Sequence, residues 1–499
     1  MSANSSALYL SQELRSIEQA ASVAGLMEKA GLALATLAKE LAADNADPIL
    51  VLAGPGNNGG DALVAARYLK QWWHRVTVVL AGDPQKFPPD ARAAYDQWLA
   101  AGGTVKNEIT LANWALVLDG LFGIGLQRPV DGIYLEFIEQ INASPSPVLA
   151  IDIPSGLCSE TGRVLGAAVR ADHTLTFLGL KPGLYTLDGP SHAGIIHFTD
   201  LGVAAESILA AQGHLLELEQ LRPVLPSRAR NSHKGSFGSV AVIGGANAMT
   251  GAVLLSARAA LMCGAGRVYA ALLAEDAPAV DLQQPEIMLR SPDKLSELPQ
   301  LDCVVIGPGL GHSADAIRLL EYWLAQDVPL LLDADALNLL SAHQHLKDAL
   351  QTRQAPSVIT PHPGEAARLL ACDNATVQQD RIHSCLRLAQ ELHTICVLKG
   401  AGTICAEPDG QWHINTSGNP GLASAGTGDV LSGIIGSLIA QGLMAIDATR
   451  LGVYLHGAAA DSLVEQGIGP VGLTASELAP AVRNLINQLN KENPYNKEK

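Results

Sequence analysis

Apolar residues along the chain follow two alternating patterns. Short continuous apolar runs, typical of buried strands, alternate with longer stretches in which apolar residues recur at helical spacing. In the first half the apolar runs occupy 49–53, 76–81, 115–118 and 148–153, with further extended segments at 174–178 and 195–199. The helical patterns occupy 14–43, 62–73, 92–101 and 135–141. This alternation predicts a parallel sheet with helices on both faces, a Rossmann-like three-layer αβα domain.

The second half repeats the alternation after an irregular segment. Its apolar runs occupy 239–244, 268–273, 303–307, 330–333, 358–360 and 395–398, and a glycine-rich hairpin follows at 403–414. The segment 204–230 contains Pro223, Pro226 and several arginines, which is typical of a linker. A chain of 499 residues is also too long for one ordinary core. We therefore expect two α/β domains, at 1–215 and 225–499.

Composition narrows the classes of function. Hydrophobic residues make up 48% and charged residues 16%, as in a well-buried globular protein. The net charge of −16 and the 4% of aromatic residues argue against nucleic-acid binding. The chain has no apolar run long enough to span a bilayer, no secretory signal pattern, and seven cysteines without CxxC spacing. We expect a cytoplasmic protein with reduced cysteines that binds neither nucleic acid nor a membrane.

A glycine-rich turn leads directly into an apolar helix near the end of the chain. The turn reads Gly426-Thr427-Gly428-Asp429. The apolar residues after it fall on one helical face, at Val430, Leu431, Ile434, Ile435, Leu438 and Ile439. Free N–H groups at a helix start, together with the helix dipole, favour a phosphate. Asp429 would then act as a general base in phosphoryl transfer, or it only caps the helix.

Polar residues follow three strands of the first half. The first strand is followed by Gly54-Pro55-Gly56-Asn57-Asn58-Gly59-Gly60-Asp61, which contains GxGxxG and admits a dinucleotide site. The side-chain oxygens of Asn57, Asn58 and Asp61 indicate a cation or a polar ring instead. Asp119 and Asp152 follow later strands. Since ligands bind outside the carboxyl ends of parallel strands, we expect these loops to converge.

Strand ends of the second half carry a similar set. Gly309, His362 and Lys399 each follow a predicted strand, and 399–403 could hold the phosphates of a nucleotide through Lys399 and backbone N–H groups. GxxxxGK[ST] does not occur in the sequence, so any nucleotide site here differs from a P-loop.

The ordered motifs resemble those of one known family. They are GPGNNGGD, LDGLFGIG, IDIPSG, HKGSFG, GPGLG, TPHPGE, VLKGAGT and NPGLASAGTGD. They resemble the bifunctional NAD(P)H-hydrate repair enzymes, in which an NAD(P)H-hydrate epimerase domain is fused to an ADP-dependent or ATP-dependent NAD(P)H-hydrate dehydratase domain of ribokinase-like fold. The resemblance covers nearly the whole chain. It implies that the substrates are NADHX and NADPHX and that the co-substrate is ADP or, in its place, ATP. It also implies a homo-oligomer.

The resemblance implies a site for the hydrated cofactor in the first half. Its residues would be Asn57, Asn58, Gly59, Gly60, Asp61, Gly123, Ile124, Gly125, Leu126, Gln127, Arg128, Pro129, Tyr134 and Asp152. A potassium ion would be held by Asn58, Asp119 and Ser155. Asp152 is our candidate for proton transfer, because the ring hydroxyl must leave and return through a planar cation.

The resemblance implies a second site for the S hydrate and the nucleotide. The S hydrate would lie near Ala252, Gly309, His362 and Asp429. ADP would lie at Lys399, Gly400, Ala401, Gly402, Thr403 and Gly428, with Mg²⁺ screening its phosphates. Asp429 would act as base in the transfer of a phosphoryl group to the ring hydroxyl, after which phosphate departs.

Three alternatives remain open from the residues alone. A ribokinase-type small-molecule kinase would use the same glycine turn but leave a stable phosphorylated product. A dehydrogenase would use the literal GxGxxG and change the redox state of NAD(P)H. A binding or scaffold module would need no catalytic Asp152.

Overall fold

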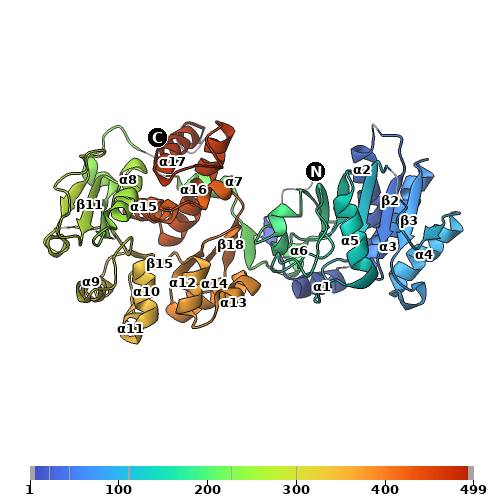
Figure 1. The fold of residues 1–499 in the computed structure, drawn as a ribbon, viewed down its shortest axis with the longest axis horizontal. Helices are drawn as coiled ribbons and strands as arrows, with labels where there is room; N and C mark the ends of the chain where they lie inside the picture. The colour runs from blue at the N-terminus through green and yellow to red at the C-terminus, as the bar shows by residue number, and fades with distance from the viewer. Residues whose placement is uncertain are drawn as a thin grey trace. The chain divides into compact units, whose positions relative to one another are not determined.

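The computed structural model describes residues 6–492, with gaps at 22, 44, 111–112, 226–227 and 299. The chain divides into two compact units, Met1–His214 and Leu215–Lys499. Each is an α/β fold, drawn in blue to green and in green to red respectively (Figure 1). The outermost residues of the two predicted domains, 1–5 and 493–499, and the linker residue Pro226 lie outside the described residues.

The first unit is built on a seven-stranded sheet in the order β4-β3-β2-β5-β6-β7-β8. All of its neighbouring strands are parallel, which confirms the predicted parallel sheet. The strands are β2 (Ile49–Ala53), β3 (Val76–Leu80), β4 (Val105–Lys106), β5 (Leu116–Gly120), β6 (Val148–Ile151), β7 (His173–Phe177) and β8 (Ile195–Thr199). The chain builds outward from β2 through β3 and β4, then returns to add β5 on the other side. The strand order therefore reverses between β2 and β5, where α/β sheets bind ligands.

Helices cover both faces of this sheet because side chains of its central strand alternate. Ile49 and Val51 of β2 pack in one cluster with α2, α3 and α4, whereas Leu50 and Leu52 pack against α5. The helices are α1 (Ser11–Ala20), α2 (Leu26–Leu41), α3 (Asn57–Gln71), α4 (Pro89–Ala100), α5 (Gly132–Ala143) and α6 (Ala205–Ile208). A short antiparallel pair, β1 (Ala7–Leu8) with β9 (Gly213–Leu215), completes the elements of this region.

Three sequence predictions for this region need correction. The helix predicted at 14–43 is two helices, because Gly25 adopts a left-handed conformation (φ +71°) where α2 begins. The helix predicted at 62–73 begins earlier, at Asn57, so the polar turn after β2 is already helical. The predicted linker 204–230 contains α6, β9 and α7 (Leu218–Leu221).

The second unit has a larger sheet with the strand order β18-β17-β16-β15-β14-β13-β10-β11-β12. Strands from β12 to β16 are parallel, and β17 and β18 form the predicted hairpin. The strands are β10 (Ser239–Gly244), β11 (Arg267–Leu272), β12 (Met288–Arg290), β13 (Cys303–Ile306), β14 (Leu330–Leu332), β15 (Ser357–Ile359), β16 (Ile395–Leu398), β17 (Thr403–Ala406) and β18 (Trp412–Asn415). Here the order reverses between β10 and β13, which defines a second candidate ligand position.

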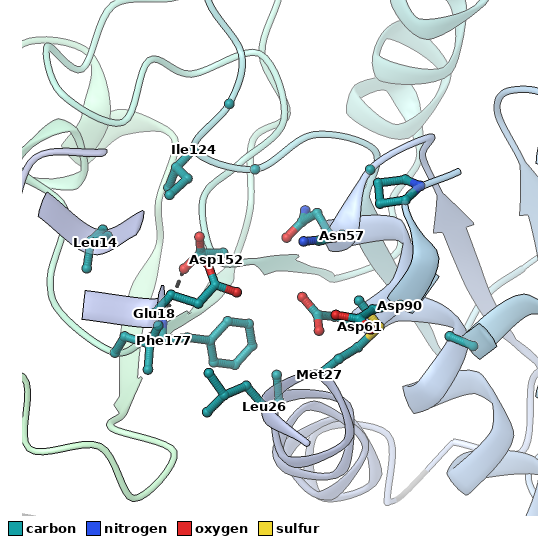
Figure 2. A pocket seen from close by; sticks show the side chains of 18 of the residues that line it. Leu14, Glu18, Leu26, Met27, Asn57, Asp61, Asp90, Ile124, Asp152 and Phe177 are labelled. Carbon is teal, nitrogen blue, oxygen red and sulfur yellow. Dashed lines mark hydrogen bonds between the residues drawn. The ribbon is translucent and has the colours of Figure 1, made fainter. Parts of the chain in front are cut away.

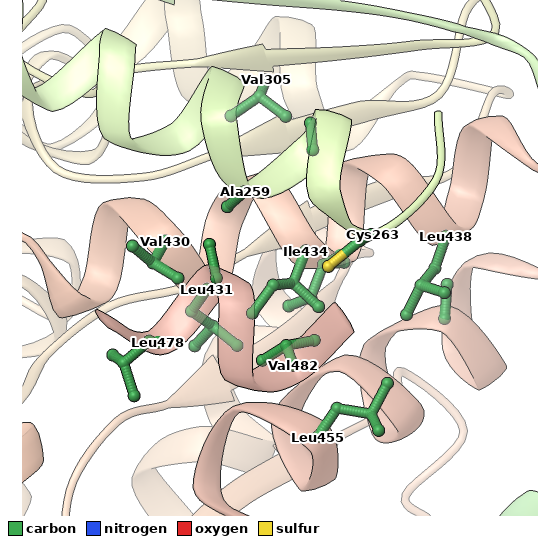
Figure 3. Packing of buried hydrophobic residues seen from close by; sticks show 14 of the residues in the cluster. Ala259, Cys263, Val305, Val430, Leu431, Ile434, Leu438, Leu455, Leu478 and Val482 are labelled. Carbon is green, nitrogen blue, oxygen red and sulfur yellow. The ribbon is translucent and has the colours of Figure 1, made fainter. Parts of the chain in front are cut away.

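Helix α15 (Thr427–Ala440) is the centre of the core of the second unit. Its Val430, Ile434 and Leu438 lie among side chains of α8, α16 and α17 (Figure 3). The sequence predicted one buried face, but every residue from Val430 to Ala440 is buried, since the sheet and three helices surround α15. The helices are α8 (Thr250–Met262), α9 (Ala314–Leu324), α10 (Asp335–Ala342), α11 (Gln344–Gln351), α12 (Pro363–Leu369), α13 (Asn374–Gln379), α14 (Arg381–Leu392), α16 (Ala445–Glu465) and α17 (Ala475–Glu492). Within the described ranges, no helix combines the length and apolarity needed to cross a membrane.

Candidate active sites

A cavity of about 1150 Å³ opens in the first unit where the strand order reverses. Its walls come from α1, the start of α2, the start of α3, and the loops after β5, β6 and β7. Figure 2 shows Glu18, Asp61 and Asp152 gathered around this space, with Phe177 and Leu26 forming an apolar side. The cavity thus combines an apolar wall with several carboxylates, as expected of a site for a polar ring compound.

Asp152 is fixed at the end of β6 by a strained backbone and a buried lysine. Its φ is +67°, a region that non-glycine residues rarely occupy. Its Oδ1 accepts hydrogen bonds from the Phe177 N–H at 3.2 Å and the Thr176 hydroxyl at 3.3 Å, and it forms an ion pair with Lys181. Lys181 is only 2% exposed and also donates to the Phe177 carbonyl at 2.8 Å. Burial lowers the pKa of Lys181, although Asp152 opposes that effect.

Two further carboxyl groups face Asp152 in the cavity. Burial raises the pKa of Asp61 well above its usual value, and the negative charges of Asp152 and Glu18 add to this effect. Burial and the nearby Asp152 carboxylate likewise raise the pKa of Glu18. Asp61 is therefore suited to keep a proton and to donate it, while the carboxylate beside Lys181 is suited to accept one.

The three predicted potassium ligands lie together beneath the cavity. Ser155 donates to both carboxylate oxygens of Asp119, from its hydroxyl at 2.6 Å and its N–H at 2.8 Å. The Asn58 amide donates to the Phe122 carbonyl at 2.9 Å, and the Ser155 hydroxyl lies 3.3 Å from the same oxygen. Asp119 is fully buried, and burial raises its pKa to about 6 although hydrogen bonds from Ser155 and Leu121 lower it. A buried carboxylate among hard oxygen donors fits an alkali cation.

The structure separates the predicted residues of the first site into two groups. Those that line the cavity are Asn57, Asn58, Asp61, Gly123, Ile124, Gly125, Leu126, Gln127, Arg128 and Asp152. Those outside its lining are Gly59, Gly60, Pro129 and Tyr134. Gly59 serves close packing, because a Cβ there would lie 2.0 Å from the Gly54 carbonyl. Tyr134 packs on Phe122 with the two ring centroids 4.7 Å apart, so it supports the cavity wall from behind.

Asp429 lies in the first turn of α15, as the glycine-rich motif predicts. Gly426 precedes the helix with φ +86°, a conformation that glycine adopts without strain. Burial, with the neighbouring carboxylates of Asp333, Asp335 and Glu365, raises the pKa of Asp429 to about 7, although the Lys399 ammonium lowers it. A carboxyl group with this pKa can exchange a proton near neutral pH.

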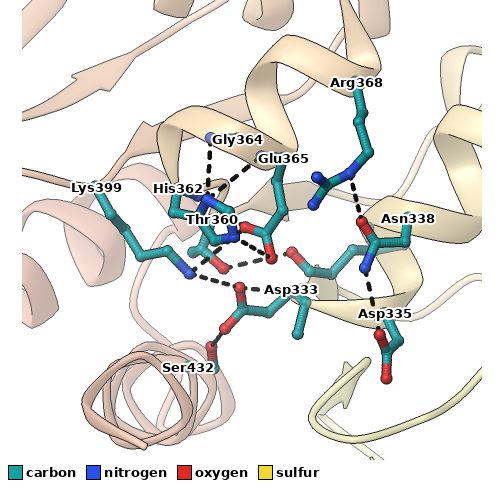
Figure 4. Close-up of polar contacts among 12 residues, drawn as sticks. Asp333, Asp335, Asn338, Thr360, His362, Gly364, Glu365, Arg368, Lys399 and Ser432 are labelled. Carbon is teal, nitrogen blue, oxygen red and sulfur yellow. Dashed lines mark hydrogen bonds and ion pairs between the residues drawn. The ribbon is translucent and has the colours of Figure 1, made fainter. Parts of the chain in front are cut away.

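A polar network lies at the ends of β14, β15 and β16 (Figure 4). The charges of its Asp333, Lys399 and Glu365 act on Asp429. Lys399 Nζ lies 2.8 Å from Asp333 Oδ1 and 3.9 Å from Glu365 Oε2. Asp333 also accepts a hydrogen bond from the Ser432 hydroxyl at 2.6 Å. The His362 N–H donates to Glu365 at 2.7 Å, and His362 Nδ1 accepts from the Gly364 N–H at 3.0 Å. Burial lowers the pKa of Lys399, but the carboxylates of Asp333 and Glu365 outweigh it and raise that pKa.

The other predicted residues of the second site lie near this network or beside one another. A Cβ on Gly428 would lie 3.4 Å from Lys399 Nζ. A Cβ on Gly309 would lie 3.5 Å from the Ala252 side chain, which brings the start of α8 against the loop after β13. Residues 399–402 form the turn between β16 and β17, where Gly400 and Gly402 have φ of +143° and +62°, and Thr403 begins β17.

Several polar residues of these sites escaped the sequence analysis. Lys181, Asp333 and His456 stand in apolar surroundings in the sequence, which is the one local signal that could have indicated burial. His456 is buried on α16, and its Nε2 donates to the Thr427 carbonyl at 3.0 Å, which supports the glycine turn. Burial lowers its pKa to about 4, so the ring is neutral. The position of Glu18 at the cavity could not be predicted, because nothing in the sequence around it indicates that α1 lies there.

Comparison with known proteins defines the class first. Residues 240–483 match the family described as NAD(P)H-hydrate dehydratase, and residues 23–183 match the YjeF-related protein N-terminus. The ADP/ATP-dependent NAD(P)H-hydrate dehydratase of Bacillus subtilis, co-crystallised with ATP and Mg²⁺, is 29% identical with a TM-score of 0.50. The match covers 55% of this chain and 98% of that chain. A ribokinase-like superfamily protein of Enterococcus faecalis has the same identity and TM-score, over 56% of this chain and 96% of its own. These matches confirm the predicted ribokinase-like fold of the second unit.

Full-length relatives then give the family. The bifunctional NAD(P)H-hydrate repair enzyme of Escherichia coli is 41% identical over 446 residues, 88% of this chain and 85% of that protein. The enzyme of the same name from Coxiella burnetii is 39% identical over 495 residues, 96% of this chain and 99% of that protein. The chain belongs to the family of bifunctional NAD(P)H-hydrate repair enzymes.

Proposed function

We propose that this chain restores hydrated NADH and NADPH in two reactions, one in each unit. The first unit epimerises the R and S hydrates, and the second dehydrates the S hydrate at the expense of ADP or ATP. Family membership supports both activities. The observation that carries the proposal is the position of Asp429, in the first turn of a buried helix beside Lys399 and with a pKa raised to about 7 by burial and neighbouring carboxylates.

Epimerisation requires that the ring hydroxyl leave from one face and return to the other. Protonation by a carboxylic acid assists its departure, and a carboxylate that removes a proton from water assists its return. The pKa of Asp61, raised mainly by burial, suits it to the first role. Asp152 suits the second role, because Lys181 holds its carboxylate in place at the cavity wall. The apolar side formed by Phe177 and Leu26 suits the planar cation between these steps.

Potassium is the ion that we propose for the first unit. Asn58, Asp119 and Ser155, with the Phe122 carbonyl, would hold it, and it would supply positive charge near the cofactor's phosphates. In thermal unfolding at constant ionic strength, KCl should raise the midpoint relative to choline chloride. Asp119→Asn should remove that increment; an unchanged increment would exclude this site.

Dehydration requires a better leaving group than hydroxide. We infer that Asp429 accepts the proton of the ring hydroxyl as it attacks the terminal phosphoryl group of the nucleotide. Lys399 and the N–H groups at the start of α15 would stabilise the charge that develops on the phosphoryl oxygens. The nucleotide leaves as AMP from ADP or as ADP from ATP. The phosphate ester then eliminates inorganic phosphate together with a proton from the adjacent ring carbon, which restores the double bond of the nicotinamide ring.

Mg²⁺ would enter the second unit with the nucleotide. Across the described residues, no group of three or more His, Cys, Asp or Glu side chains could hold a metal ion by itself. The phosphate oxygens of the nucleotide would therefore supply most of the ligands, with Asp333 as the nearest carboxylate to Lys399. Mg²⁺ bound in this way would screen the phosphate charges.

A mixture of R and S hydrates separates the two activities in one experiment. With ADP and Mg²⁺, NAD(P)H absorbance should recover completely and free phosphate should equal the NAD(P)H formed. Recovery that stops at the S fraction would remove the epimerase, and a stable phosphorylated hydrate would indicate a kinase instead.

A further inference from the structure

A buried guanidinium lies behind the loop that joins β16 to β17. Arg381, at the start of α14, is only 2% exposed. Its Nη2 donates long hydrogen bonds to three carbonyl oxygens, at 3.4 Å to Leu398, 3.5 Å to Lys399 and 3.3 Å to Gly402. Its Nη1 lies 3.3 Å from the side-chain oxygen of Gln378. One side chain therefore gathers carbonyl groups from both ends of the 399–402 segment.

The charge of Arg381 lacks a counter-ion in the part of the chain that the structure describes. The hydrogen-bond acceptors of its Nη1 and Nη2 are neutral oxygens, and its Nε has no hydrogen-bond partner among the described residues. Burial lowers the pKa of Arg381 to about 10, so the group still carries its charge at neutral pH. A buried charge without a partner is costly, and an anion bound close by would lower that cost.

Arg381 also determines which way the peptide groups of the loop point. In a trans peptide unit the C=O and N–H point in opposite directions. Because the Lys399 carbonyl points toward Arg381, the Gly400 N–H points away from it. A Cβ on Gly400 would lie 2.4 Å from Arg381 Nη1, so a side chain cannot be accommodated on this face of the loop. The opposite face thus presents the Gly400 N–H beside the Lys399 side chain, while the Lys399 N–H donates to the Pro361 carbonyl at 2.9 Å. A backbone N–H next to an ammonium group suits an anion.

We propose that Arg381 is a positioning residue for the nucleotide phosphates. It orients the 399–402 loop with the Gly400 N–H outward, and it places a positive charge behind that surface. The ligand class is a nucleoside diphosphate or triphosphate. This inference rests on the proposed nucleotide site at 399–403, and it assigns Arg381 no contact with the nucleotide.

Calorimetric titration of the full chain with ADP and Mg²⁺ tests the inference. Arg381→Met should weaken ADP binding at least tenfold and raise the KM for ADP, with a smaller change in kcat. Arg381→Lys should recover part of the affinity, since it keeps the charge but reaches fewer carbonyls. If Arg381→Met does not fold, Arg381→Gln gives the same test, because it keeps donors and drops the charge.

Arg353 offers a matched control. Its guanidinium donates to the carbonyls of Trp323 at 3.0 Å, Leu324 at 2.6 Å and Gln326 at 2.9 Å, a similar set of contacts away from the 399–403 loop. Arg353→Met should lower the unfolding midpoint without changing ADP affinity. Wild-type affinity in Arg381→Met or Arg381→Gln would overturn the inference. If the wild-type chain bound no ADP, the proposed nucleotide site would be excluded, and this inference would be excluded with it.

Discussion

Asp152 follows a strand of a parallel sheet and Asp429 lies in the first turn of α15, and different neighbours set their behaviour. Asp152 pairs with a buried lysine, whereas Asp429 lies among the carboxylates of Asp333, Asp335 and Glu365. The first environment holds a carboxylate in one orientation. The second favours the protonated form until the pH approaches about 7. In the proposed reactions the same residue type is therefore suited to two different acid and base tasks in one chain.

Asp152→Asn should lower the epimerase rate by about 10²-fold to 10⁴-fold, the usual contribution of a general acid or base. Cofactor binding should persist, because the amide keeps the size of the carboxylate. The rate is measured as interconversion of separated R and S hydrates. Asp90→Asn is the control, since Asp90 also lines the cavity but lies at an exposed position. Equal losses in the two variants would contradict the role of Asp152.

Lys399→Met should move the pH dependence of the dehydratase to higher pH. Asp429 acts as a base in its deprotonated form, so the rate of the wild-type chain should rise with pH through about 7. The Lys399 ammonium lowers the pKa of Asp429, and its removal therefore raises that pKa. The pH profile of kcat/KM for the S hydrate measures the shift. A rising limb at the wild-type position would show that Asp429 is not the titrating base.

Local sequence identified the residues that follow strands but not the partners that reach them from elsewhere. Asn58 and Asp119 were predicted from strand ends and Ser155 from the family resemblance, and the three lie together in the structure. Lys181 and Asp333 were missed, because burial of a charged side chain depends on contacts distant in sequence. Lys399 and Asp333, for example, are 66 residues apart.

At the scale of elements, strand order and helix burial decide where chemistry is placed. Both sheets reverse their strand order beside a candidate site, between β2 and β5 and between β10 and β13. The alternation of apolar runs predicted these sheets well, since each buried strand is short and continuous. It missed β4 and β12, short strands at the sheet edges whose residues are half-buried or exposed and therefore form no continuous apolar run. It also placed the start of α3 too late, because Gly59 and Gly60 look like a loop in sequence. In the structure Gly59 packs against the Gly54 backbone after β2, and Gly60 packs against α2 and α4.

Gly433→Ala should destabilise the second unit through the contact of α15 with α8. A Cβ at Gly433 would lie 2.0 Å from the Ser256 carbonyl, and backbone cannot move aside easily. We expect this clash to lower the free energy of unfolding by about 1–3 kcal/mol or more, whereas the higher helix propensity of alanine would raise it by about 1 kcal/mol. Thermal unfolding, followed through the residual dehydratase activity, measures this loss of stability. Gly251→Ala is the control, since no atom lies within 4 Å of its Cβ position; a midpoint equal to that control would show that the helices can separate.

At the scale of the whole molecule, the contacts that build each site come from one unit. The residues lining the first cavity all belong to Met1–His214, and the network around Asp429 belongs to Leu215–Lys499. The two reactions are linked by a common substrate, since the first converts the R hydrate into the S form that the second consumes.

A mixture of two chains, each with one of the two units inactivated, should therefore repair the cofactor completely. Asp152→Asn alone should stop at the S fraction of a mixed hydrate, and Asp429→Asn alone should form no NAD(P)H. Combined in one solution with ADP and Mg²⁺, they should restore full recovery by diffusion of the S hydrate. The NAD(P)H absorbance follows the reaction. Recovery that stays at the S fraction would mean that the intermediate passes only within one chain.

The packed cores of the two units also protect the cysteines from oxidants. All seven are free thiols, and five of them are buried. Burial raises the pKa of Cys263 to about 12, which suppresses the thiolate that peroxide and alkylating agents attack. The proposed reactions use carboxylates, lysines and backbone amides, so neither step needs a sulfur atom. Treatment of the folded protein with hydrogen peroxide or iodoacetamide should leave both rates unchanged, and the enzyme should keep repairing cofactor when thiol-dependent enzymes around it have stopped.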